Sequence, residues 1–147
     1  MLDDAADKLL ELVDEEVKRL PKDYQSTSNI VIGGFGQGAA VCLAAYLKHK
    51  GPESLGGVMS LSGMQCYSDY LPDGSINIAD DMKIRRNTPM FIFHGKDDEK
   101  IPFENAKLSY EYITESLYKF NYKEKLLLLY QDKARSELTP MEITKFG

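Results

Sequence analysis

The chain has 147 residues, enough for one domain with a buried core, and its 43% hydrophobic and 28% charged residues are typical of a globular protein. A formal net charge of −5 argues against a primary role on nucleic acid or anionic lipid, because both require a basic surface. The apolar runs are too short to span a membrane, and the acidic N-terminal segment resembles neither a signal peptide nor a transit peptide. The two cysteines, Cys42 and Cys66, make neither a disulfide framework nor a metal quartet, and Cys42, which lies among alanines, is interpreted as a buried small hydrophobe. We therefore predict no cofactor, no metal and a reducing compartment, the cytoplasm.

The first part of the chain alternates helical and strand patterns. Residues 2–20 repeat apolar side chains every three or four positions, which predicts an amphipathic helix. The apolar run at 29–34 predicts a buried strand, and the small residues at about 37–49 predict a helix that packs closely on a sheet. His49, between two lysines, is interpreted as a solvated helix end. Residues 57–63 predict a second apolar strand.

The second part of the chain begins with a long segment, residues 64–88, that has no periodicity and many turn residues. A loop of that length in a compact domain is usually functional or an interaction surface. Strands are predicted at 89–94 and 125–130, with a helix at about 103–120 between them and a closing helix at 138–146. This α/β alternation favours a single domain over residues 1–147, with a mostly parallel sheet of about four strands and helices on both faces.

A glycine-rich turn lies between strand 29–34 and the helix that follows it. The segment Gly34-Phe35-Gly36-Gln37-Gly38 leads from a buried strand into a helix, and it resembles the nucleophile elbow of the α/β-hydrolases. In that G-x-S-x-G motif the central serine attacks an ester or thioester carbonyl. Gly36 stands at the position of the serine.

Further segments resemble one group of α/β-hydrolases, the acyl-protein thioesterase, lysophospholipase and carboxylesterase family. Residues 33–39 are similar to its elbow G-G-F-S-Q-G-G, and residues 94–102 are similar to its pattern H-G-x-x-D-x-x-V-P. Residues 12–17 resemble the helix before the elbow, and residues 57–63 resemble the strand after it. The family fold begins with further strands that have no counterpart in this chain, so the resemblance implies the C-terminal half of an α/β-hydrolase fold.

The resemblance also implies that the catalytic positions are degenerate. It places Gly36 at the nucleophile, Asp98 at the acid and Arg135 at the general base, while Gln37 keeps a position whose backbone N–H donates to the oxyanion. Glycine has no side chain to attack with, and arginine stays protonated at physiological pH, so it cannot act as a general base. No histidine follows His94 in the sequence, so a small slip in register does not restore the base. We hypothesise an ion pair between Asp98 and Arg135 in place of the family's Asp–His hydrogen bond.

Other residues that carry chemistry are interpreted as structural. His94 closes a strand at a position where the family's histidine is structural. Ser60 and Ser62 end a strand and have no evident histidine partner, so they are interpreted as packing or turn residues. The acidic clusters at 80–81 and 97–99 lack the ligand spacing of a metal loop and are interpreted as solvated.

The sequence therefore predicts a catalytically inactive hydrolase-like domain, a pseudo-thioesterase, that serves as a structural or interaction subunit of a larger protein assembly. Strand 29–34 lacks a neighbour on one side, so other protein chains are predicted to cover its open edge and the 64–88 loop. Two alternatives stay open. One is an acyl- or lipid-binding module that keeps the family's pocket, and the other is a residual carboxylesterase or acyl-protein thioesterase.

Overall fold

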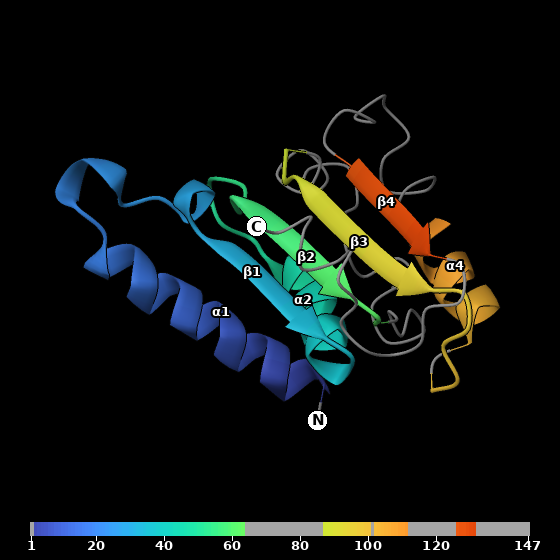
Figure 1. Cartoon of the computed structure of the whole chain (residues 1–147). Coiled ribbons are helices and arrows are strands. Elements are labelled where there is room, and N and C mark those ends of the chain that lie inside the picture. The colour runs from blue at the N-terminus through green and yellow to red at the C-terminus, as the bar shows by residue number, and fades with distance from the viewer. Residues whose placement is uncertain (1, 64–86, 101, 112–125, 132–147) are drawn as a thin grey trace.

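The computed structural model describes residues 2–63, 87–100, 102–111 and 126–131 (Figure 1). The elements in chain order are α1 (Leu2–Arg19), the 3₁₀ turns η1 (Lys22–Tyr24) and η2 (Thr27–Asn29), β1 (Val31–Phe35), α2 (Gln37–Lys48), β2 (Gly57–Leu61), β3 (Met90–Gly95), α4 (Phe103–Glu111) and β4 (Leu126–Gln131). The described strands and the helices α1 and α2 agree with the sequence pattern to within one or two residues at each end, and the two 3₁₀ turns were not predicted. Residues 64–86, the end of the helix predicted to reach 120, and the closing helix at 138–146 lie outside the described residues.

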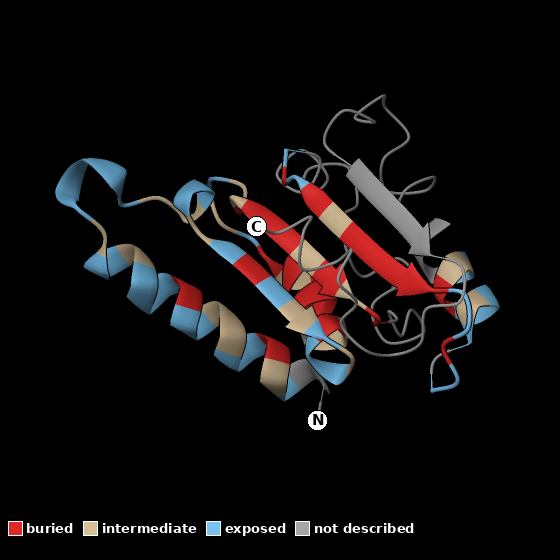
Figure 2. Cartoon of the chain, in the orientation of Figure 1, coloured by how far each residue is buried: buried red, intermediate tan, exposed pale blue. Residues whose placement is uncertain are grey.

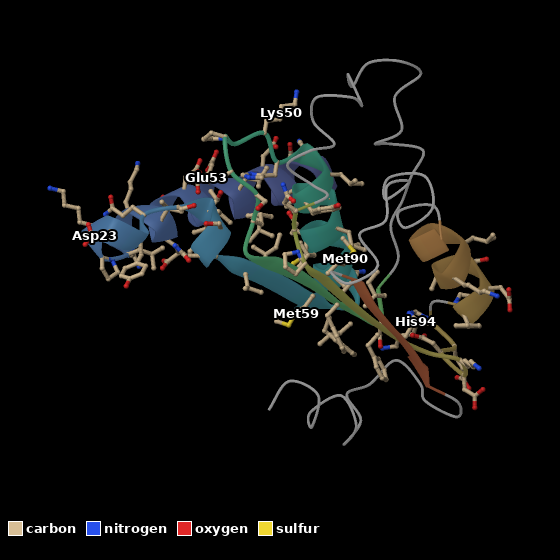
Figure 3. The ribbon with its side chains drawn as sticks, turned by 90° about the horizontal axis from the view of Figure 1, so that it is seen from above. Asp23, Lys50, Glu53, Met59, Met90 and His94 are labelled. Atoms are coloured by element: carbon tan, nitrogen blue, oxygen red, sulfur yellow. The ribbon has the colours of Figure 1, made fainter. Side chains whose placement is uncertain are left out.

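The sheet has four parallel strands in the order β1-β2-β3-β4, which confirms the predicted α/β class. The helices α1, α2 and α4 all lie on the same side of this sheet (Figures 1 and 3). Right-handed crossovers that step in the same direction along a sheet place their helices on the same face, which explains this arrangement for α2 and α4. The closing helix predicted at 138–146 lies outside the described residues, so helices on the second face of the sheet stay a prediction.

The hydrophobic core lies between the sheet and the helices α1 and α2 (Figure 2). Small side chains along α2 let this helix approach the sheet closely, as the sequence predicted, and α1 packs against the same helix. The buried residues of α2 include Ala39, Leu43, Ala44 and Ala45, which have no exposed surface. The N-terminal helix adds two more side chains to the same core, Ala6 and Val13.

Two polar side chains at α2 differ in how well they were predicted. Cys42 is a buried free thiol, as expected, and desolvation raises its pKa to about 11. The interpretation of His49 as a solvated helix end is wrong, because this residue is only 7% exposed. Its Nε2 atom lies 2.9 Å from the carbonyl oxygen of Glu53, so a hydrogen bond to the following loop compensates the burial.

Strand β1 is buried on one face only. Ile32 points toward the core and is 5% exposed, whereas Val31 and Phe35 point to the opposite face and are 56% and 44% exposed. The predicted burial of this strand therefore holds for one face of β1 only, since no helix of the described residues covers its second face.

Candidate functional site

The candidate site is the tight turn between β1 and α2. Gly36 has φ 58° and ψ −119° and forms the N-cap of α2. Its N–H donates to the carbonyl oxygen of Leu61 at 2.9 Å, and its own carbonyl accepts from Ala39 and Ala40 at 3.1 and 3.3 Å. Hydrogen bonds to both β2 and α2 thus hold the turn, which has the backbone course of a nucleophile elbow.

Two further glycines allow the chain segments around this turn to approach each other closely. A Cβ atom at Gly34 would overlap the backbone of Gly38, so α2 begins directly against the strand that precedes it. A Cβ atom at Gly63 would overlap the side chain of Ala39 and would lie 3.1 Å from the carbonyl oxygen of Gly36. The end of β2 therefore passes directly beside the elbow.

The space above Gly36 is open. A Cβ atom built on Gly36 meets no other atom within 4 Å, so the position that the resemblance assigns to the nucleophile has room for a side chain. Its positive φ is adopted by glycine without the strain that other residues carry. Gln37, the first residue of α2, has an exposed side chain next to this space.

At the end of β3, His94 and Asp98 form a buried pair (Figure 3 labels His94). Nε2 of His94 lies 3.5 Å from Oδ2 of Asp98, and neither side chain is exposed. The other carboxylate oxygen, Oδ1, accepts from the N–H of Lys100 at 2.9 Å. The structural interpretation of His94 thus agrees with its full burial, but its pairing with Asp98 was not predicted. The spacing of four residues across a turn was the signal in the sequence that could have indicated it.

Arg135 lies outside the described residues, so its ion pair with Asp98 stays a prediction. The acidic cluster 97–99 is only partly solvated, because Asp97 and Glu99 are exposed whereas Asp98 is buried. Within the described ranges, no group of three or more His, Cys, Asp or Glu residues is arranged to hold a metal ion.

Ser62 is a strained residue beside the elbow. Its φ of 53° is positive, and it is the single non-glycine residue of the described part with this property. The residue is 1% exposed, its N–H donates to the carbonyl oxygen of Phe93 at 2.8 Å, and its Oγ has no hydrogen-bond partner among the described residues. A strand-end serine was predicted here, whereas its backbone strain was not, because strain depends on where β2 and β3 end relative to each other.

The parallel sheet and the glycine elbow at the carboxyl end of β1 define the α/β-hydrolase class of fold. The chain belongs to the phospholipase/carboxylesterase family, whose model matches residues 1–139. A similar relative is acyl-protein thioesterase 1 of Yarrowia lipolytica, 38% identical over 90 residues that make up 61% of this chain and 36% of the relative. Carboxylesterase SOBER1 of Arabidopsis thaliana is 29% identical over 105 residues, 71% of this chain and 41% of the relative.

The crystal structure of Arabidopsis SOBER1 has the same fold. It superposes with a TM-score of 0.73 at 22% identity, covering 99% of this chain and 60% of SOBER1. Acyl-protein thioesterase 2 of Zea mays gives a TM-score of 0.67 at 20% identity, covering 99% of this chain and 61% of that structure. The chain thus spans about two fifths of the curated relatives and about three fifths of these structures. None of the helices in the described part of the chain is long and apolar enough to cross a membrane.

Proposed function

We propose that this chain is a catalytically inactive member of its hydrolase family, a pseudo-thioesterase, and acts as a structural or interaction subunit of a larger protein assembly. The observation that carries the proposal is Gly36, which keeps the elbow backbone but brings no nucleophile to it. Acyl transfer through a triad needs a nucleophile, a base that takes its proton and a group that orients the base.

The assignment of the other catalytic positions belongs to the same proposal. Asp98, at the acid position, pairs with His94, which is buried at the end of β3. Arg135 at the base position carries a permanent charge and cannot accept a proton. The N–H of Gln37 is assigned as one oxyanion donor. A cytoplasmic location stays a prediction.

Ester turnover by the purified chain tests the proposal. We expect p-nitrophenyl butyrate and a palmitoyl thioester to be hydrolysed no faster than in a heat-denatured control, and a fluorophosphonate probe to leave the chain unlabelled. Turnover that exceeds this control would contradict the proposal. The variant Ser62→Ala then identifies the source, because a loss of that turnover would make the buried Ser62 the nucleophile.

Restoring the missing side chains is a second test. The single variant Gly36→Ser and the double variant Gly36→Ser with Arg135→His are both expected to stay inactive, because the resemblance assigns only one oxyanion donor, the N–H of Gln37, to this sequence. Strong esterase activity in the double variant would mean that the rest of the site is intact.

A second candidate function is an acyl- or lipid-binding module. The open space above Gly36 favours it, since an acyl group bound there would meet no side chain from the elbow. Saturable binding of a fluorescent long-chain acyl probe, reduced by filling the space with Gly36→Leu, would support this function. Binding that is equal in the two proteins would count against it.

A further inference from the structure

We draw no further inference here: the strongest candidate, the exposed apolar patch that Val31 and Phe35 form on the face of β1 opposite α2, carries none because nothing in the described part of the structure shows what covers it.

Discussion

The glycines of the elbow have different structural roles, and alanine substitutions can distinguish them. Gly36 has φ 58° and open space around its Cα atom, so its replacement meets backbone strain but no atom. Gly38 lies in the first turn of α2, also with open space, and its φ is not positive. An alanine in place of Gly34 would place its methyl group into the backbone of Gly38.

These differences predict a different change in the free energy of unfolding for each of the three alanine substitutions. For Gly36→Ala, strain of about 1–3 kcal/mol, offset by about 0.4–1 kcal/mol from the reduced freedom of the unfolded chain, gives a net loss of about 1–2 kcal/mol. Gly38→Ala is expected to gain about 0.5–1 kcal/mol, because alanine is the better helix former. Gly34→Ala is expected to lose about 3 kcal/mol or more, because backbone must move to admit its methyl group.

Urea unfolding followed by circular dichroism measures the differences. With a denaturant slope of about 1–3 kcal/mol per molar, the midpoints of Gly36→Ala and Gly38→Ala should differ by about 1 M. Gly38→Ala is the matched control, since it makes the same chemical change two residues away. If Gly36→Ala proved as stable as Gly38→Ala, the positive φ would not be what selects glycine at the elbow.

Substitutions at three other residues test the buried polar groups. Asp98→Ala should lower the free energy of unfolding by about 2–4 kcal/mol because it removes a buried partner of His94 and of the Lys100 N–H. Asp98→Asn keeps an acceptor oxygen and should lower it less. Equal losses for the two variants in urea unfolding would contradict this expectation. Ser62→Gly should stabilise the fold by about 1 kcal/mol, by relieving a positive φ and removing a buried hydroxyl, and Ser62→Ala should gain less. Burial raises the pKa of Cys42 from 9.0 to about 11, so its contribution to stability is complete below pH 9 and is lost as the pH rises toward 11. The stability difference between the wild type and Cys42→Ala should shrink over that range, and an unchanged difference would refute the raised pKa.

The sequence predicted the parts of the fold that depend on local pattern. The apolar periodicity of residues 2–20 and the glycines around residue 36 were sufficient to place α1, β1 and α2. The parallel sheet followed from the alternation of elements, and its strand order agrees with the chain order.

Properties that depend on tertiary packing were predicted less well. His49 was expected in solvent, but the loop that follows α2 folds back and places a carbonyl oxygen against its ring. The pairing of His94 with Asp98 had a local signal that was not used, the spacing of four residues across a turn. The strain at Ser62 arises where the ends of β2 and β3 meet. No local pattern reports such a meeting, because it depends on register between segments that are distant in the sequence.

The backbone of the elbow is held without any contribution from a side chain at residue 36. Its hydrogen bonds to Leu61, Ala39 and Ala40 come from backbone groups, and no atom lies within 4 Å of a Cβ atom built on Gly36. A glycine at this position therefore costs the fold none of these contacts, and it avoids the strain that a positive φ imposes on other residues. The proposed inactivity thus requires no loss of structure, because the turn keeps its place between β1, β2 and α2 while it carries no nucleophile.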